Sequence, residues 1–292
     1  MYELIQVSEH DYYFDCPAKI GLIRVSESDV ILIDSGNDKD AAKKVLKAID
    51  ANGWKIRAVY ATHSHADHIG GCRLLQDRSG CKVFANGMEA AFTAYPILES
   101  SVLYGGNPYK DLRHKFLLAE ACEVTPLTND VLPDGMTVIP LPGHSFDMAG
   151  FLTADGNAFI ADSVCSEETL TKYGIGYLWD VGQSLATLEA LKSVQAKRFI
   201  PAHAPVTEEI GTLADINIAS IQKVIGVIEE ICAVPRGFDA LLAAVFDRFG
   251  LMMNASQHAL IGSTVRSYLT YLVGEGRLAV SFDGSVMQWV RA

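Results

Sequence analysis

Short apolar runs separated by turn residues alternate with helix-like stretches from the N-terminus to about residue 210. Apolar runs bounded by turn residues predict strands at 4–7, 12–15, 21–25, 30–33, 57–61, 81–85, 121–125, 137–141, 148–153, 157–160 and 198–200. Apolar residues spaced three or four positions apart predict helices at 40–51, 66–77, 87–94, 112–119 and 181–194. This alternation predicts a layered α/β fold in which helices cover the faces of sheets.

Residues 87–120 interrupt the alternation of strands and helices. The two helices predicted there are separated by Pro96 and by the loop Tyr104–Tyr109, which contains two glycines and two tyrosines. Long excursions of this kind form walls or lids of substrate pockets, but they also serve surface packing. The sequence leaves both alternatives open, and a lid insertion at 87–120 is a hypothesis for the structure to address.

Residues 211–292 are organised differently, which predicts a second domain after a first domain at 1–210. Helices are predicted at 212–231, 238–249 and 255–272, and strands at 277–282 and 286–290. Helices followed by a β-hairpin resemble a winged-helix module. The recognition helix of DNA-binding versions is basic, whereas the last predicted helix here has Arg266 as its one arginine or lysine. We therefore expect this domain to serve packing, homodimerisation or completion of a pocket.

The charge balance argues against a nucleic-acid partner. Hydrophobic residues make up 49% of the chain and charged residues 20%, as in soluble proteins with a large core. The formal net charge is −11, and residues 211–292 contribute −1 of it through six basic and seven acidic side chains. Neither part has the positive surplus that phosphate backbones attract, so we expect no nucleic acid and instead a small-molecule partner.

Cysteine spacing and the N-terminal residues bear on the compartment. The six cysteines are far apart and form no CxxC pair, which predicts reduced thiols in a cytoplasmic protein. The first residues lack the basic and apolar segments of a signal peptide. No run approaches 18 uninterrupted apolar residues, so we also expect no membrane span.

The segment Thr62–His68 concentrates metal-binding side chains directly after a predicted strand. Side chains alternate between the two faces of an extended segment, so His63 and His65 project to the same side. Asp67 and His68 follow where the chain turns into the next helix. Three imidazoles and a carboxylate within six residues form a ligand set suited to zinc, iron or manganese.

Further polar residues follow the ends of other predicted strands. They are Asp34, His144, Asp162 and His203. Strand ends are where rigid scaffolds present functional side chains, and such a repetition is improbable by chance. Asp34 could instead cap the helix that begins near Asp38, and for this residue both interpretations stay open.

On five segments the chain resembles the metallo-β-lactamase superfamily. The segments are Leu32-Ile33-Asp34-Ser35-Gly36, His63-Ser64-His65-Ala66-Asp67-His68, Pro142-Gly143-His144-Ser145, Ala161-Asp162-Ser163 and Pro201-Ala202-His203. They occur in the family's order within residues 1–210. The resemblance implies a four-layer αββα sandwich with a dinuclear metal site at one edge, followed here by the helical, winged-helix-like domain.

The resemblance also implies how the ligands divide between two metals. One metal would be bound by His63, His65 and His144. The other would be bound by Asp67, His68 and His203. Asp162 would bridge the two metals, and Asp34 would support ligands from one layer further out. We expect two divalent ions per chain, with zinc favoured and iron or manganese as alternatives, because histidine and carboxylate ligands accept all three.

Within the superfamily, the ligand set resembles that of the glyoxalase II and lactonase branch. Antibiotic-hydrolysing members of the main class have a cysteine where this chain has Asp162, and flavodiiron oxygen reductases have a glutamate where it has His65. Members that degrade nucleic acids add a clamp domain or basic surfaces. The basic residues that bind glutathione in glyoxalase II have no convincing counterparts, so glutathione is not assigned as part of the substrate.

We therefore expect hydrolysis of a small thioester, ester or lactone by a hydroxide that bridges the two metals, with Asp67 as the catalytic residue that orients it. A phosphodiesterase or nuclease acting at the same site is the alternative reaction, since two metals also suit that displacement. A ligand-sensing protein that retains the site without catalysis is the alternative from another class. Purely structural metal sites are closed and need no bridged pair, which counts against it.

Overall fold

The computed structural model describes residues 2–292. The larger sheet contains, in spatial order, β1 (Glu3–Gln6), β2 (Asp11–Asp15), β3 (Ile20–Arg24), β4 (Asp29–Ile33), β5 (Lys55–Ala61), β6 (Lys82–Ala85) and β7 (Thr125–Pro126). The second sheet contains β11 (Arg198–His203), β10 (Asn157–Cys165), β9 (Ala149–Leu152) and β8 (Thr137–Pro140). A small sheet near the C-terminus contains β12 (Arg236–Gly237), β14 (Val286–Arg291) and β13 (Leu278–Asp283).

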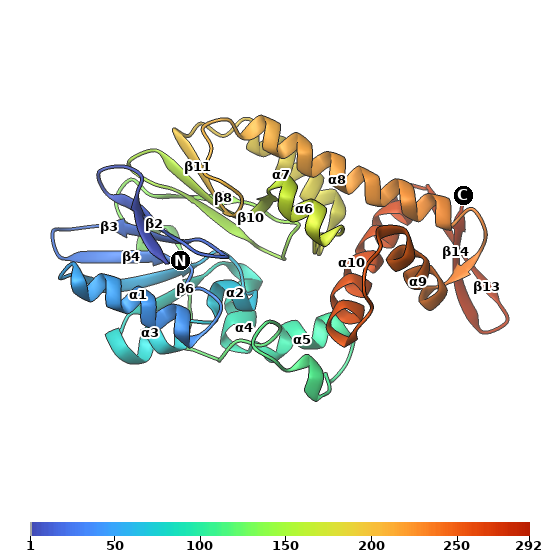
Figure 1. The fold of residues 1–292 in the computed structure, drawn as a ribbon, viewed down its shortest axis with the longest axis horizontal. Coiled ribbons are helices and arrows are strands. Elements are labelled where there is room, and N and C mark those ends of the chain that lie inside the picture. The colour runs from blue at the N-terminus through green and yellow to red at the C-terminus, as the bar shows by residue number, and fades with distance from the viewer. Residues whose placement is uncertain (1) are drawn as a thin grey trace.

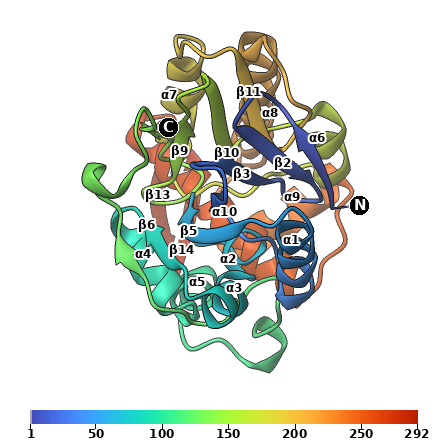
Figure 2. The ribbon, with the colours of Figure 1, turned by 90° about the vertical axis from the view of Figure 1, so that its left-hand side faces the viewer.

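Helices cover the outer faces of the two large sheets. The α-helices are α1 (Lys39–Ala51), α2 (Ala66–Ile69), α3 (Cys72–Ser79), α4 (Gly87–Ala94), α5 (Ile97–Tyr104), α6 (Glu167–Tyr173), α7 (Val181–Leu191), α8 (Ile210–Ile231), α9 (Phe238–Phe249) and α10 (Ala255–Gly274), and the 3-10 turns are η1 (Lys110–Leu112) and η2 (Asn129–Val131). Figure 1 shows α1 and α3 on one side of the molecule and α7 and α8 on the other. Figure 2 shows the strands of both sheets between these helix pairs.

Strand periodicity builds the interfaces between the layers. In β4, Val30 and Leu32 pack in the core shared with α1 and α3, whereas Ile31 and Ile33 pack in the core between the two sheets. Successive side chains point to opposite faces of a strand, so a strand buried on both faces needs a continuous apolar run. The αββα sandwich expected from the sequence is confirmed.

Strand pairing determines which chain ends meet at the sheet edge. β4 pairs parallel with β5, and β10 pairs parallel with β11. The carboxyl ends of parallel neighbours lie at the same edge of a sheet. The residues that follow β4 and β5 therefore lie at one edge of the first sheet, and the carboxyl ends of β10 and β11 lie at one edge of the second.

Two glycines divide the helix that the sequence predicts at 66–77. α2 and α3 are separated by Gly70 and Gly71. A Cβ on Gly70 would lie 2.1 Å from the carbonyl oxygen of Asn37, and one on Gly71 would lie 2.4 Å from that of Ser35. Only glycine permits this close backbone approach. It brings the histidine-bearing turn against the loop that follows β4.

Residues 87–120 differ from their prediction. α4 lies where it is expected, but the predicted helix at 112–119 is wrong, because the chain is irregular there apart from the end of η1. Sequence analysis also missed α5. The hydroxyl of Ser100 in α5 donates a hydrogen bond of 2.5 Å to the carbonyl of Leu117, so tertiary contacts hold the irregular segment. Whether this region moves as a lid stays a prediction.

The C-terminal elements pack directly on the sandwich. α8 begins beside the second sheet and extends to the small sheet near the C-terminus (Figure 1). One continuous core includes Ile160 of β10, Leu188 of α7, Ile228 of α8 and Val265 of α10. The helical extension with its hairpin is confirmed, while its division from residues 1–210 as a separate domain stays a prediction.

α8 is long and apolar enough, by length and composition alone, to cross a membrane. A core helix of a soluble protein has the same properties, so this is weak evidence for a span. Ala214, Ile221, Val224 and Ile228 of α8 are buried in the core described above. The apolar composition of α8 therefore has a packing explanation.

Candidate metal centre

Three imidazole nitrogens converge beyond the ends of β5 and β8. The Nε2 atoms of His63 and His144 each lie 3.0 Å from Nδ1 of His65. His63 and His65 belong to the loop between β5 and α2, and His144 to the loop between β8 and β9. Ligand atoms of a tetrahedral site with bonds of about 2.0–2.1 Å are about 3.3 Å apart. The three rings therefore match a single metal position.

A second group consists of Asp67, His68, Asp162 and His203, whose ligand atoms lie within 4.8 Å of one another. Nε2 of His203 lies 3.3 Å from a carboxylate oxygen of Asp67 and 3.3 Å from one of Asp162. The same Asp162 oxygen is 3.5 Å from Nε2 of His144, so this carboxylate faces both groups. The structure thus brings together the seven residues proposed from the sequence, and their roles as ligands stay proposals.

Two buried polar atoms without hydrogen-bond partners indicate that the nitrogen and oxygen atoms of this site are suited to a bound cation. In the described part of the chain, Nε2 of His68 and Oδ1 of Asp162 are buried and have no hydrogen-bond partner. These atoms lie 3.1 Å apart. Buried polar atoms are nearly always satisfied, and a cation bound by both would satisfy them. Imidazole nitrogens and carboxylate oxygens together fit zinc, iron or manganese.

Hydrogen bonds on the opposite ring nitrogens orient the histidines. Nδ1 of His68 donates to the carboxylate of Asp34 at 2.7 Å. Nδ1 of His144 and Nδ1 of His203 donate to backbone carbonyls at 3.1 and 2.8 Å. With the proton held on Nδ1, the Nε2 lone pair of each ring is free to bind a metal.

Asp34 connects the loop after β4 with the loop after β5. Its buried carboxylate also accepts hydrogen bonds from the Thr62 amide at 2.7 Å and from the Thr62 hydroxyl at 2.8 Å. Its φ is +66°, a conformation that costs a residue with a side chain about 1–3 kcal/mol. The cap of α1 is Asp38, so of the two interpretations left open for Asp34 the capping one is wrong.

Glu89 holds the two histidine-bearing loops together, and sequence analysis missed it. Its buried carboxylate accepts from the amide and hydroxyl of Ser64 at 2.9 and 2.6 Å, from the Ser145 hydroxyl at 2.7 Å and from the Asp147 amide at 3.0 Å. Ser64 and Ser145 are direct neighbours of the proposed ligands. An acid in the first turn of a helix is ordinary, so nothing in the sequence singles out Glu89.

The two groups differ in their electrostatics. Burial lowers the pKa of His63 well below its usual range and lowers the pKa values of His65 and His144 to about 4. Burial also acts on His68, but Asp162 and two further carboxylates outweigh it and raise the pKa of His68 well above its usual range. Metals bind deprotonated ligands, so the first group is ready for a metal at neutral pH. The second group favours positive charge, which a metal ion brings.

A cavity of about 550 Å³ opens onto both groups. Side chains of the proposed ligands His65, Asp67, His144, Asp162 and His203 line it. Its apolar wall includes Leu103, Phe116 and Leu117 from the 87–120 region and Ile261 from α10. The 87–120 region is therefore a wall of the site, and α10 completes the cavity.

A family model described as the metallo-beta-lactamase superfamily matches residues 13–203. A hydroxyacylglutathione hydrolase from Rhodopseudomonas palustris (strain BisB18) is 27% identical over 146 residues, which cover 49% of this chain and 45% of that protein. A protein of the same name from Bradyrhizobium sp. (strain ORS 278) is 27% identical over 133 residues, covering 44% and 42%. The chain thus spans less than half the length of these relatives.

Two solved structures resemble the whole fold, including the C-terminal helices. A beta-lactamase domain protein from Burkholderia ambifaria has a TM-score of 0.79 and 17% identity, covering 99% of this chain and 94% of that one. A metallo-beta-lactamase family protein from Thermus thermophilus has a TM-score of 0.74 and 17% identity, covering 99% and 97%. At such identities the likeness concerns the fold alone.

Proposed function

The chain belongs to the metallo-beta-lactamase superfamily, and from this premise we propose that it is a metal-dependent hydrolase of a small thioester, ester or lactone. The observation that supports the proposal is the convergence of seven histidine and aspartate side chains, which could hold metal ions in two groups, at one cavity. Bound at such a pair, divalent ions supply a water with a pKa near 7 and polarise a carbonyl. His63, His65 and His144 would hold one ion, and the second group the other.

Asp67 is the residue we assign to orienting the attacking water. Its side chain is 39% exposed, in contrast to the 8% exposed side chain of Asp162, and it lines the cavity. Burial alone would raise the pKa of Asp67, but His68 and His203 outweigh burial and lower it. Asp67 therefore stays a carboxylate near neutral pH and accepts a hydrogen bond from water next to the reacting carbonyl.

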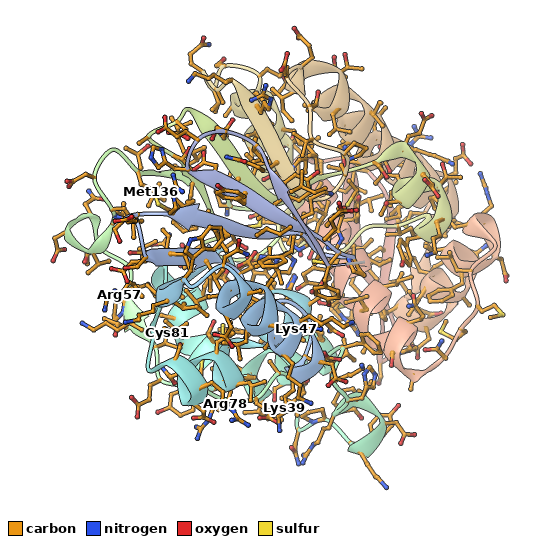
Figure 3. The ribbon with its side chains drawn as sticks, turned by 60° about the vertical axis from the view of Figure 1, so that its left-hand side comes forward. Lys39, Lys47, Arg57, Arg78, Cys81 and Met136 are labelled. Carbon is orange, nitrogen blue, oxygen red and sulfur yellow. The ribbon has the colours of Figure 1, made fainter. Side chains whose placement is uncertain are left out.

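The proposal does not include glutathione as the thiol part of the substrate, although it occurs in the names of the relatives. Hydroxyacylglutathione carries carboxylates, and no lysine or arginine in residues 2–292 lines the cavity. Figure 3 shows Lys39 and Lys47 on the outer surface of α1, and Arg78 on that of α3. The basic side chains of this layer thus face solvent, which supports a substrate other than a glutathione thioester.

A substrate panel with metal analysis on the same sample tests this function. Thioesters and lactones are assayed beside the phosphodiester bis-p-nitrophenyl phosphate, with protein loaded with zinc, iron or manganese. We expect turnover of carboxylic esters of one of these kinds and little turnover of the phosphodiester. Preference for the phosphodiester would replace the proposed reaction, and loaded protein inactive on the whole panel would favour a ligand-sensing role.

A further inference from the structure

A buried carboxyl group faces the site cavity from α5. Glu99 is 8% exposed, and it lines both the cavity and a smaller pocket that His65 also lines. Its Oε2 atom is buried, and no hydrogen-bond donor in the described part of the chain binds it. Buried side-chain oxygens usually have a partner, so the partner of this one is to be sought in a ligand.

The other carboxylates that line the cavity belong to an ion pair or to the second group of proposed metal ligands. A carboxylate oxygen of Asp38 lies 2.7 Å from Nζ of Lys115, and Asp67 and Asp162 belong to the second metal group. Burial, followed by nearby acids, raises the pKa of the Glu99 carboxyl well above its usual range. No lysine or arginine of residues 2–292 lies on the cavity wall to pair with Glu99.

Packing fixes the position of Glu99. Ser100, its neighbour in α5, is buried and bonds to the carbonyl of Leu117. One turn along α5, Leu103 packs in a cluster with Leu117 and with Ala259 of α10. The carboxyl group therefore sits on a helix that is held from two sides. A group kept buried without a partner costs stability, which is typical of a group retained for binding.

We propose that Glu99 is a specificity-determining residue, which binds an ammonium or amide N–H of the substrate while the scissile carbonyl lies beside the two groups of proposed metal ligands. The inference rests on the proposed hydrolase function and names its substrate class: acyl compounds with an apolar chain and a nitrogen donor. Leu103, Leu260 and Ile261 line the cavity and would contact the chain. A substrate carboxylate at this end of the cavity would find no lysine or arginine among residues 2–292 on the wall and would face Glu99.

The burial of the Glu99 carboxyl group determines how strongly the site discriminates between substrates with and without a nitrogen donor. A nearby ammonium favours the ionised form of the carboxyl group, which repays part of the cost of burial. A site built to bind a substrate N–H rejects an analogue without it by about 10⁴- to 10⁵-fold, because its own polar group is then left unpaired. Even partial pairing at Glu99 should therefore give at least about 10-fold discrimination.

Thermal stability tests the role of Glu99 without any substrate. Glu99→Leu replaces the unpartnered carboxyl with an apolar side chain, and we expect its Tm in zinc-loaded protein to equal or exceed that of the parent. Glu99→Gln should also keep the parent Tm, and Glu123→Gln makes the same change at an exposed site. A fall in Tm for both Glu99 variants would show that the carboxyl is structural, and would overturn the proposal.

Calorimetry tests the predicted ligand chemistry independently of hydrolysis. On zinc-loaded parent protein at pH 7, n-hexylammonium should bind at least about 10-fold more tightly than n-pentyl methyl ether, which has the same number of heavy atoms but no N–H or O–H donor for the buried carboxyl group. Glu99→Gln should lose most of that preference, whereas Glu123→Gln should keep it. Equal affinities in the parent, or an unchanged preference in Glu99→Gln, would overturn the proposal.

Hydrolysis assays then distinguish the role of Glu99 from the proposed hydrolase function on which it rests. Acyl thioesters of graded length are compared with a terminal amine, methyl or carboxylate group. We expect the amine series to have the highest kcat/KM and the carboxylate series the lowest, with the order of amine and methyl reversed in Glu99→Leu. An unchanged order in that variant overturns the role of Glu99 alone, whereas no hydrolysis of any series overturns the proposed function and leaves the calorimetric result standing.

Discussion

Asp67 and Asp34 are both carboxylates near the proposed metal centre, but they lie at different distances from the cavity. Asp67 faces the cavity, whereas Asp34 is buried behind His68. We expect Asp67→Asn to lower kcat/KM by more than about 100-fold and Asp34→Asn by about 10–100-fold, the usual effect of losing an outer partner of a metal ligand. The two variants are compared at matched metal content. Near-normal turnover of metal-loaded Asp67→Asn would show that another group orients the water.

Glu89 offers a residue-scale test of how the ligand loops are held. In Glu89→Gln an amide NH₂ group would replace one oxygen and confront backbone and hydroxyl donors from Ser64, Ser145 and Asp147. We expect the free energy of unfolding to fall by about 2–4 kcal/mol, because hydrogen bonds to charged groups are lost. Urea denaturation of the loaded protein measures it.

The exposed variant Glu123→Gln is the control for Glu89→Gln. It should change the unfolding free energy by less than about 0.5 kcal/mol, as surface substitutions usually do. Equal, small effects at both positions would mean that the Glu89 network does not hold the loops.

At this scale the sequence predicted the convergent histidines and aspartates but not Glu89 or Glu99. Clustered histidines such as His63 and His65 are chemically conspicuous in any context. Glu89 and Glu99 lie in the first turns of α4 and α5, where acids are common because they complement the helix dipole. Their function depends on what packs around them, and local sequence does not contain that information.

Among the elements, the break between α2 and α3 positions the turn that carries His63, His65 and His68. We expect Gly70→Ala to lower the free energy of unfolding by more than about 2 kcal/mol. The added Cβ would overlap the backbone of Asn37, and relieving the overlap requires the backbone of one of the two segments to move. Gly226 in α8 has no atom within 4 Å of an added Cβ, so Gly226→Ala should instead stabilise by about 0.5–1 kcal/mol. Denaturant titration of both variants checks the opposite signs, and a stabilising Gly70→Ala would contradict the close-approach argument.

Element prediction succeeded where periodicity and burial agree. β4, for example, has the apolar run Val30–Ile33, and β5 has the buried run Ala58–Ala61, as in strands covered on both sides. It failed at 112–119, where helix-forming residues are held in an irregular path by tertiary bonds such as that between Ser100 and Leu117. It also missed α6, although Ser166 caps this helix through the Thr169 amide at 3.1 Å. Short helices have too few periodic positions to be distinguished from loops.

For the whole molecule, the shared core suggests that the C-terminal residues are needed for folding. A chain ending at residue 209 would lack α8 and expose Ile160, Leu188 and Leu191, which pack in the same core as Ile228. We expect this truncated chain to show no cooperative thermal transition by circular dichroism, in contrast to the full chain. A transition near the Tm of the full chain would establish residues 1–209 as an independent domain.

Two groups of proposed metal ligands share one cavity, so the number of metal ions bound per chain shows whether both groups bind a metal. The protein is incubated with excess zinc, iron or manganese, desalted and measured by elemental analysis against protein concentration. We expect about two ions per chain, one for each group of converging ligand atoms. Substituting His144 should remove about one of these ions and leave the other. One ion or none in the parent protein with every metal would contradict the dinuclear centre.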